Sequence, residues 1–481
     1  MNVQDTIAAI EALTATSNGT DLVTKERFDV VNPATGKVFA SAPAVRPEQL
    51  DQVFADAQAA FHLWKRDESA RRDAMRRAAD VIEATVSTLA RILTMEQGKP
   101  VAEAGSEILS AVHWLRYYAD LELPREVIRD DADGYEEIFR RPMGVVSAIT
   151  PWNFPVGLAM WKIAPALRAG NTLVVKPSPY TPLATLALGQ ALRGVLPDGV
   201  LNIVTGPDPL GAAMVAHPVP RKVSFTGSTS VGKKVALGAA PDLKRVTLEL
   251  GGNDPAIILP DVDVDEIAPR LFWSAFRNSG QICVAVKRLY AHESIKPRLV
   301  EALGELAASV RMGDGLQEGV ELGPVNNRPQ WERVNDLVND ARSRGARVVA
   351  GGETAGDGGY FFRPTVLDAV DDSFRVVAEE QFGPVLPVLS FRDEDDVVRR
   401  ANDSEYGLTA SVWSNDIERA AGIAAQIDSG QVAINQHARG LGPHLPFGGH
   451  KWSGIGVENG PWGLYSFTEM QVIAGPARMT G

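Results

Sequence analysis

Cys283 is the only cysteine among 481 residues, and it follows the polar turn Asn-Ser-Gly-Gln-Ile at 278–282. A single thiol in a chain of this length supports neither a disulfide framework nor a thiolate metal cage. It is therefore either a small buried filler or a nucleophile. The turn favours the nucleophile, because reactive groups are usually displayed on loops at the ends of regular elements.

Two further side chains suit carbonyl chemistry. Glu249 ends an apolar run just before a Gly-Gly pair at 251–252, where a partly buried carboxylate is either a general base or a capping or paired group. Asn153 lies in the rigid segment Pro-Trp-Asn-Phe-Pro at 151–155, where its amide either donates to an oxyanion or forms a turn. The residues alone leave both alternatives open.

Residues 225–234 run from a predicted strand into a predicted helix. The stretch from Gly227 to Lys233 nearly matches the nucleoside-triphosphate loop, but that motif needs Ser or Thr next and this chain has Lys234. A triphosphate site is therefore rejected, whereas the free amides of a helix start still suit a diphosphate. Lys176 follows another predicted strand and suits ribose hydroxyls or phosphate, the alternative being a surface lysine.

The histidines suggest no further catalytic group. None of the seven has metal-ligand spacing, and none is placed by sequence to serve as a base for the cysteine. His437, His444 and His450 cluster near the C-terminal end, where they suit surface or packing positions equally well. We expect no metal site.

These residues must be positioned by regular elements, and from Gly144 onward short β-rich runs alternate with helical stretches. This alternation indicates parallel βαβ units and a doubly wound sheet, with ligands at the carboxyl ends of the strands. Helical apolar spacing predicts helices at 47–65, 70–96 and 101–121. The predicted strands are 145–149, 171–176, 200–204, 222–226 and 245–250, then 286–291, 347–350, 385–391, 411–413 and 431–435.

We therefore expect an α/β fold with two α/β domains and an exposed arm. The charged, extended segment at 120–142 predicts the arm, and the strand-like residues 464–473 are expected to pair with it or with another subunit.

Composition narrows the class of partner. Forty-eight Lys and Arg against 60 Asp and Glu give a net charge of −12, which argues against wide contact with nucleic acid or an anionic membrane. Three prolines, an asparagine and a lysine interrupt the long apolar stretch 144–167, so no membrane span is expected there. The N-terminus does not read as a signal peptide, and one cysteine fits a reducing compartment, which together predict a cytoplasmic protein.

Together and in this order, the motifs resemble those of the aldehyde dehydrogenase superfamily over nearly the whole chain. The match runs from Asn-Pro-Ala-Thr-Gly at 32–36 to Leu-Pro-Phe-Gly-Gly-His-Lys-Trp-Ser-Gly at 445–454. Its most specific elements are Leu-Glu-Leu-Gly-Gly at 248–252, Gly-Gln-Ile-Cys at 280–283 and Glu-Glu-Gln-Phe-Gly-Pro at 379–384.

The resemblance implies that Cys283 attacks an aldehyde, while the Asn153 amide and the Cys283 backbone N–H hold the oxyanion of a thiohemiacetal. Hydride transfer to nicotinamide would leave a thioester, which water activated by Glu249 would hydrolyse to the acid. Cysteine is both a good nucleophile and a good leaving group, so this chemistry requires no histidine. An apolar substrate tunnel would be lined by Phe154, Leu158, Trp161 and Phe447.

The implied cofactor is NAD or NADP. Where many NAD-dependent members carry a glutamate that binds the adenosine ribose, this chain has Pro179, which makes NADP more tolerable. NAD stays slightly favoured, because no additional arginine is evident beside the lysine. The positions that match family cofactor contacts are Ile149, Thr150, Pro151, Trp152, Lys176, Ser178, Pro179, Gly227, Ser228, Glu380 and Phe382.

Several alternatives remain for substrate and reaction. The aromatic tunnel favours an apolar or aromatic aldehyde, whereas Arg439, unless it is a solvated surface residue, would pair with the distal carboxylate of a semialdehyde. Glu249 disfavours a member that transfers the acyl group to coenzyme A, and a cofactor-free thiol esterase would leave the Rossmann-like half unexplained. The resemblance also implies a role for each part of the α/β fold: a Rossmann-like cofactor-binding (dinucleotide-binding) domain at 1–119 and 143–252, a second α/β catalytic domain at 253–460, and a small β oligomerisation arm at 120–142 and 461–481. It further implies a homodimer or homotetramer, with the arm and tail adding strands across subunits.

Overall fold

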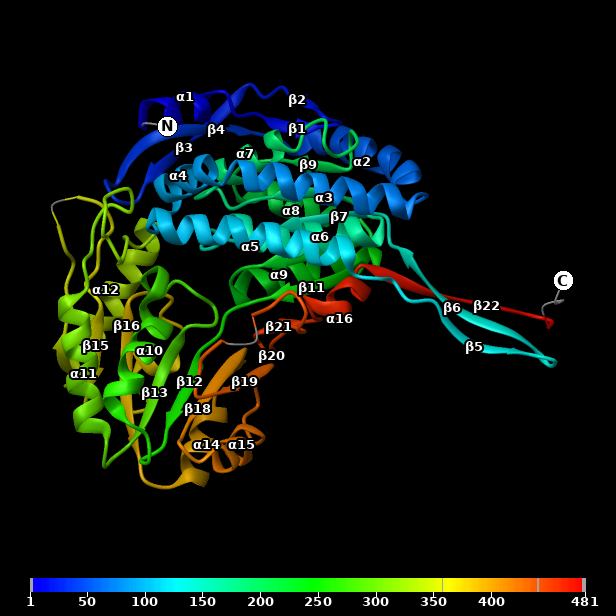
Figure 1. Ribbon diagram of the computed structural model, residues 1–481. Coiled ribbons are helices and arrows are strands. Elements are labelled where there is room, and N and C mark those ends of the chain that lie inside the picture. The colour runs from blue at the N-terminus through cyan, green and yellow to red at the C-terminus, as the bar shows by residue number, and fades with distance from the viewer. Residues whose placement is uncertain (1–2, 357, 439–440, 478–481) are drawn as a thin grey trace.

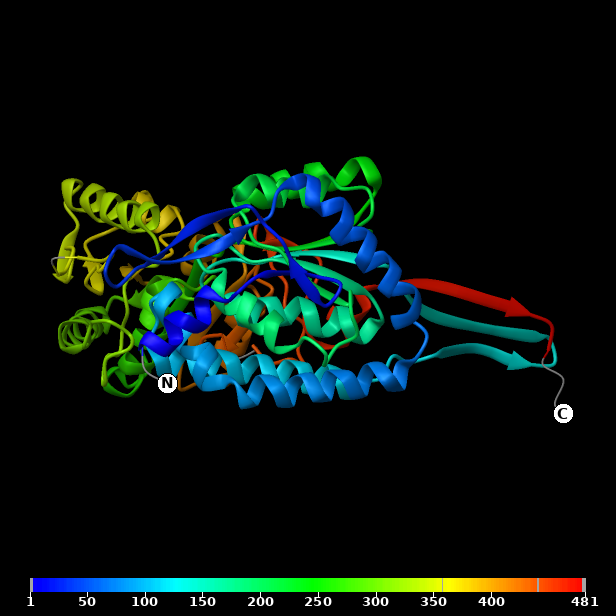
Figure 2. The same ribbon diagram turned by 90° about the horizontal axis from the view of Figure 1, so that it is seen from above.

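The structure is a computed structural model and describes residues 3–356, 358–438 and 441–477. Two sheets, each with its own helices, form the body of the molecule, and a three-stranded arm projects from one end of it (Figure 1). Seen from above, the arm extends well clear of the helices (Figure 2). No helix among the described residues has both the length and the apolar character needed to cross a membrane.

The first sheet has the strand order β21-β11-β10-β7-β8-β9, in which all neighbours except β21 and β11 run parallel. Its central strands are buried along their whole length, as expected for a parallel sheet covered by helices on both faces. The strands are β7 (Val145–Ile149), β8 (Thr172–Lys176), β9 (Leu201–Ile203), β10 (Lys222–Thr226), β11 (Arg245–Glu249) and β21 (Gly454–Ile455). The helices between them are α6 (Pro155–Ala169), α7 (Leu183–Ala191), α8 (Asp208–Ala216), α9 (Thr229–Ala239) and the turn η2 (Ala240–Asp242).

The N-terminal part adds a layer of helices and two hairpins to this sheet (Figure 1). The long helix α5 packs on α6 and carries residues that reach the site described below. The helices are α1 (Val3–Glu11), η1 (Pro47–Gln49), α2 (Leu50–Trp64), α3 (Glu68–Ala84), α4 (Val86–Gln97) and α5 (Val101–Asp120). The hairpins are β1 (Ala15–Ser17) with β2 (Thr20–Leu22), and β3 (Glu26–Asn32) with β4 (Lys37–Ala44).

The second sheet has the order β14-β15-β16-β13-β12-β18-β19, parallel except between β14 and β15. Its strands are β12 (Asp254–Ile258), β13 (Val286–His292), β14 (Arg347–Ala350), β15 (Thr365–Asp368), β16 (Val385–Phe391), β18 (Thr409–Trp413) and β19 (Gln431–Ile434). Its helices are α10 (Val264–Phe276), η3 (Arg277–Gly280), α11 (Lys296–Ser309), α12 (Arg328–Ser343), α13 (Arg375–Ala378), α14 (Glu394–Asn402) and α15 (Ile417–Ala424).

The arm is the antiparallel sheet β22-β6-β5. Strands β5 (Glu126–Asp131) and β6 (Gly134–Pro142) form the predicted hairpin, and β22 (Thr468–Gly475) pairs with β6 along its whole length. Strands β17 (Tyr406–Gly407) and β20 (His450–Lys451) pair in a further small sheet. Helix α16 (Gly460–Tyr465) directly precedes β22 in the chain.

The predicted strands match the observed ones closely, although β12 and β15 of the second sheet were not predicted, and two predictions need correction. The helix predicted at 70–96 is two helices that break at Thr85, and the strand predicted at 464–473 begins only at Thr468, because the Gly-Pro pair at 460–461 starts helix α16. The hairpins within 15–44 were not predicted, because their exposed strands alternate too weakly to give a strand pattern.

Candidate active site

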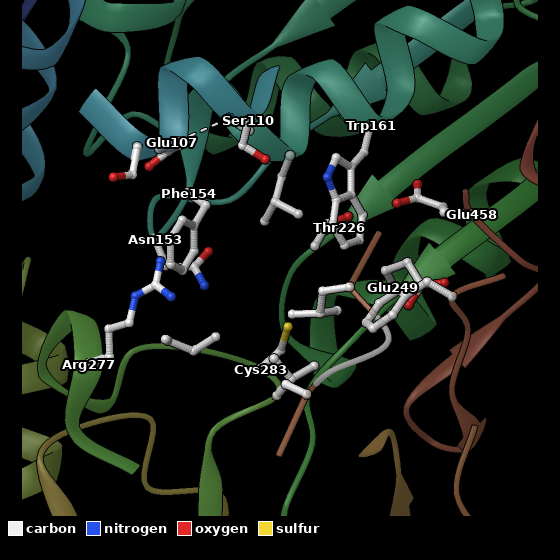
Figure 3. Close-up of a pocket in the computed structure, with 18 of the residues that line it drawn as sticks. Glu107, Ser110, Asn153, Phe154, Trp161, Thr226, Glu249, Arg277, Cys283 and Glu458 are labelled. Atoms are coloured by element: carbon white, nitrogen blue, oxygen red, sulfur yellow. Dashed lines mark hydrogen bonds between the residues drawn. The ribbon is translucent and has the colours of Figure 1, made fainter. Parts of the chain in front are cut away.

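The cysteine is presented by a turn between helix α10 and strand β13. Asn278 and Ser279 adopt left-handed conformations, with φ of 50° and 54°, and Gly280 follows at φ +70°. A Cβ at Gly280 would lie 2.1 Å from the Gly383 carbonyl oxygen, so only glycine fits there. The turn aims the half-buried Cys283 thiol into a pocket between the two sheets (Figure 3).

That pocket has a volume of about 450 Å³, and predicted site residues that lie far apart in the sequence meet in it. Figure 3 shows the Cys283 sulfur between the Asn153 amide on one side and the Glu249 carboxylate on the other. The predicted catalytic and tunnel residues all line it: Asn153, Phe154, Leu158, Trp161, Glu249, Cys283 and Phe447.

The Asn153 amide is fixed by its surroundings. Its Nδ2 donates to the Gln281 carbonyl oxygen at 2.9 Å, which uses one of its N–H groups and leaves the other to serve the pocket. Its backbone oxygen accepts from Lys99 Nζ at 2.8 Å, and Lys99 is itself paired with Glu107 at 2.6 Å. Glu107 also accepts from two backbone amides at the start of α6, so a buried ion pair holds the Asn153 loop in place.

The Glu249 carboxylate has the environment of a general base. It ends strand β11, is buried, and neither of its oxygens has a hydrogen-bond partner within the described chain. Burial raises its pKa well above the ordinary value, and the neighbouring Glu458 adds to that shift while Lys162 opposes it. A buried acceptor without a partner is costly, which suggests that a water molecule or a reacting group completes it.

A polar chain continues behind the glutamate. Lys162 Nζ donates to Thr226 Oγ1 at 2.7 Å and to Glu458 Oε1 at 2.6 Å, and all three residues line the same pocket or lie directly behind it. Ser224 also donates to Glu458, at 3.2 Å. These groups tune the charge on Glu249 and were not predicted as site residues.

Burial raises the pKa of Cys283 to about 12, and the nearby carboxylates Asp254, Glu380 and Glu249 add to the shift, whereas Lys287 opposes it. The free thiol is therefore protonated at neutral pH. Because the thiolate is the nucleophile, the reaction requires a group that removes the thiol proton or stabilises the thiolate.

The carboxyl ends of β7, β8 and β10 form the predicted cofactor edge. Lys176 is buried there with its Nζ donating only weakly, at 3.3 Å, to the Pro177 carbonyl, and burial lowers its pKa to about 8. Ser228 caps helix α9 beside Gly227, and the buried Thr150 hydroxyl has no partner in the described chain. Ile149 ends β7, and Pro151, Trp152, Ser178 and Pro179 continue from the same edge.

The second half of the cofactor edge comes from the loop after α13. Glu380 Oε1 accepts from the Gly252 amide at 3.0 Å, and Phe382 stands edge-on to Trp152 with ring centroids 5.3 Å apart. The hydroxyls and diphosphate of a dinucleotide would satisfy three features of this edge. They are the Thr150 hydroxyl, which has no partner in the described chain, the buried Lys176 amine, and the capped start of helix α9. The residues present therefore fit NAD or NADP.

The upper wall of the pocket is aromatic. Trp161 stacks on Trp114 at 5.5 Å with an interplanar angle of 12°, and meets Phe447 edge-on at 5.2 Å. Arg277 lies at the rim, where its side chain is 56% exposed and Nε bonds Glu103 Oε1 at 3.0 Å (Figure 3). This wall suits a flat apolar group, and the rim offers one cation that is partly balanced by Glu103.

The histidine in the pocket wall takes no part in this chemistry. His437 lines the pocket wall but is buried, and its ring bonds Ser411 at 2.8 Å and the Val284 carbonyl at 2.9 Å. Burial lowers its pKa to about 3, so it is neutral and structural. Arg439 lies outside the described residues, and within those residues no group of three potential metal ligands comes together.

Sequence reasoning missed the lysines Lys99, Lys162 and Lys287, and the acidic partners of the first two, Glu107 and Glu458. One signal was available: Lys162 lies in an otherwise apolar helix, where an unpaired ammonium would be costly. Its partner Glu458 is 296 residues away, so no local pattern could identify the pair.

Comparisons with known proteins agree with this geometry. Residues 21–473 match the model of the aldehyde dehydrogenase family. The chain is 38% identical over 454 residues to a 3-sulfolactaldehyde dehydrogenase of Pseudomonas putida, covering 93% of each chain. It is 37% identical to an NADP-dependent succinate-semialdehyde dehydrogenase of Escherichia coli, covering 93% of this chain and 94% of that one. The NAD+ complex of an aldehyde dehydrogenase from Bacillus cereus superimposes with a TM-score of 0.96 at 35% identity, covering 99% of both chains.

Proposed function

This chain belongs to the aldehyde dehydrogenase family, and from that premise we propose the roles of its site residues and the class of its substrate. As an NAD(P)-dependent aldehyde dehydrogenase, it oxidises an aldehyde with NAD or NADP, and its α/β fold is that of the family. One observation carries the proposal: a thiol, an amide and a partnerless buried carboxylate converge in one pocket beside the cofactor edge.

The Cys283 thiol releases its proton to solvent, and the sulfur of the resulting thiolate attacks the aldehyde carbon to form a tetrahedral thiohemiacetal anion. Asn153 Nδ2 and the Cys283 backbone N–H donate to the oxyanion. Bound NAD or NADP supplies the hydride acceptor. When the oxyanion collapses and the C–H bond breaks, Cys283 retains the acyl group as a thioester. Glu249 takes a proton from water, whose oxygen attacks the thioester, and the acid leaves as the Cys283 thiol is restored.

The cofactor is held at the edge described above by the eleven predicted positions. Lys176 and Ser178 are placed for the adenosine ribose, Gly227 and Ser228 for the diphosphate, and Glu380 and Phe382 for the nicotinamide half, with residues 149–152 between them. Pro179 brings no carboxylate to the ribose site, so NADP is tolerated, and NAD is the slightly favoured cofactor. We assign the cofactor domain to 1–119 and 143–252, the catalytic domain to 253–460 and the arm to 120–142 and 461–481.

An assay for reduced nicotinamide tests the function directly. Aldehyde with NAD or NADP is expected to give its absorbance without coenzyme A, because Glu249 hydrolyses the thioester. Dependence on coenzyme A would favour acyl transfer. No signal with a broad aldehyde panel, alongside intact ester cleavage, would instead favour the thiol esterase.

The substrate class that we propose is an apolar or aromatic aldehyde, because Trp161, Phe154 and Phe447 line the same pocket as the cysteine. Trp161→Ala is expected to lower kcat/KM for benzaldehyde-type substrates by about 10- to 100-fold, since a lost aromatic contact and its buried area are worth about 1–3 kcal/mol. Short aliphatic aldehydes should change much less. Steady-state kinetics on both classes, each with NAD and NADP, provide the measurement.

Arg277 favours a second candidate, a semialdehyde whose distal carboxylate would displace Glu103 from the guanidinium. Arg277→Met removes the charge that a distal carboxylate would bind, and it is the counterpart of Trp161→Ala. If benzaldehyde-type substrates are preferred and keep their kcat/KM in this variant, the aromatic assignment holds. A strong native preference for a semialdehyde that Arg277→Met abolishes would reverse it.

We also propose that the protein is a cytoplasmic homodimer or homotetramer that joins through its arm. Both edge strands of the arm expose apolar side chains, among them Val472 at 66% exposure, Met470, Val127 and Ile128. Exposed apolar edges invite pairing with another chain. Light scattering is expected to give a dimer or tetramer, and Val472→Lys to shift the population to smaller species. A monomeric native protein would contradict the proposal.

A further inference from the structure

A buried lysine, Lys287, lies directly behind the loop that carries the cysteine. It is the second residue of β13, and its side chain is only 3% exposed. Its Nζ donates to the Ile282 carbonyl oxygen at 2.9 Å and to the Cys283 carbonyl oxygen at 2.7 Å. Lysine is rarely buried unless its charge is compensated, and none of the steps proposed above uses this one.

The first of these bonds fixes an orientation. The Ile282 carbonyl and the Cys283 N–H belong to the same peptide group, and in a trans peptide the two point in opposite directions. A lysine that holds the carbonyl oxygen from behind the loop therefore turns the Cys283 N–H away from itself, toward the pocket. A cation on the carbonyl also polarises the peptide, which makes its N–H a stronger donor.

The second bond holds a carbonyl that packs against the segment between β11 and β12. The Cys283 carbonyl lies so close to Gly252 that a Cβ there would approach its oxygen to 2.6 Å. Gly252 in turn donates its amide to Glu380, a predicted cofactor residue, whose Oε1 is 3.6 Å from Lys287 Nζ. The ammonium thus stands between the cysteine loop and the carboxylate expected to meet the nicotinamide ribose.

Charged and titratable groups face this ammonium from each neighbouring element. Asp254 on β12 is buried, and its pKa is raised to about 7 by that burial, with Lys287 opposing the rise. Glu380 comes from the loop after α13, and His437, from the loop after β19, is neutral. Glu249, at the end of β11, lies beyond the thiol. Lys287 therefore offsets the charges of Asp254, Glu380 and Glu249 around Cys283.

We propose that Lys287 is a positioning residue for the oxyanion, fixing and polarising the peptide between Ile282 and Cys283 so that the Cys283 N–H becomes the second donor beside Asn153. The inference rests on the proposed role of Cys283. The same ammonium stabilises the Cys283 thiolate against the carboxylates around it. Because these effects act on the oxyanion and on the thiolate, they concern the rate of the acylation step more than the affinity for aldehyde.

Lys287→Met tests this, because methionine fills similar space without a donor or a charge. The pre-steady-state burst of reduced nicotinamide is expected to slow by about 10- to 100-fold, with a much smaller change in the aldehyde KM. The pH profile of Cys283 alkylation by iodoacetamide should move to higher pH. Lys287→Arg, which keeps charge and donors, should recover part of the rate, and Lys287→Gln, which keeps donors only, should recover less of the alkylation profile.

Lys244→Met is the matched control. Lys244 is also buried and bonds a carbonyl, that of Val215, and the Asp242 carboxylate, but it lies outside the active-site pocket. The proposal fails if Lys244→Met slows the burst as much as Lys287→Met does. It also fails, and Lys287 is merely structural, if Lys287→Met lowers only Tm and leaves the burst and the alkylation profile native. An active Cys283→Ala enzyme would instead overturn the proposed function itself.

Discussion

Cys283→Ala is expected to abolish aldehyde-dependent formation of reduced nicotinamide while leaving NAD or NADP binding close to the native level. The chain has no second thiol that could substitute, and removal of a nucleophile typically costs a factor on the order of 10⁴ or more in kcat. The cofactor edge is built from other elements, chiefly β7, β8 and β10, so it should survive. Stopped-flow absorbance measures the first quantity and quenching of tryptophan fluorescence by the cofactor measures the second.

Alkylation provides the control for this variant. Iodoacetamide at alkaline pH should add one group to the native protein and none to Cys283→Ala, which mass spectrometry can count. Because burial raises the pKa of Cys283 to about 12, the thiolate fraction, and with it the alkylation rate of the free enzyme, should still be rising with pH above neutrality. An alkylation rate that levels off below neutral pH would contradict the raised pKa of Cys283. Residual dehydrogenase activity in Cys283→Ala would contradict its role as the nucleophile.

The parts of the fold that could be predicted are those with local patterns. Strands such as Val145–Ile149 and Lys222–Thr226 are short runs rich in β-branched and apolar residues between turn signals, because a parallel sheet buries both faces. The terminal residue of such a strand is also a site prediction, and Glu249 and Lys176 both follow this rule. The family motifs then supplied the roles, which local pattern could not.

The parts that could not be predicted depend on contacts between distant segments. Lys99 reaches the Asn153 carbonyl across 54 residues, and Lys162 reaches Glu458 across 296. Lys162 stands out locally only as a charge in a largely apolar helix, and only the tertiary structure shows that each lysine is buried and paired. Lys287 is similar, because its function as inferred here depends on which carbonyl oxygens lie in front of it.

Glu249→Gln is expected to keep the burst of reduced nicotinamide and to lower steady-state turnover by about 100- to 1,000-fold, because an amide cannot accept the proton from water. The acyl-enzyme should then accumulate and be visible by mass spectrometry as an adduct on Cys283. Since the pKa of Glu249 is raised, native turnover should fall as pH drops below that raised value, when the carboxylate becomes protonated. The variant should lack this limb, and a variant with native turnover would exclude Glu249 as the base.

Because the Glu249 carboxylate is buried, its ionisation is expected to lower the free energy of unfolding. The unfolded carboxyl ionises near its ordinary pKa, whereas the folded one ionises only at higher pH, so the unfolded state binds fewer protons over that interval. Stability is therefore lost as pH rises through it, and the loss is complete only above the raised pKa, where the carboxylate is ionised and can act as the base. Glu249→Gln removes this cost, so its Tm is expected to equal or exceed the native value at neutral pH and to approach it in acid. A Tm difference that is the same at all pH values would show that Glu249 ionises normally, and would remove the basis for its role as a tuned base.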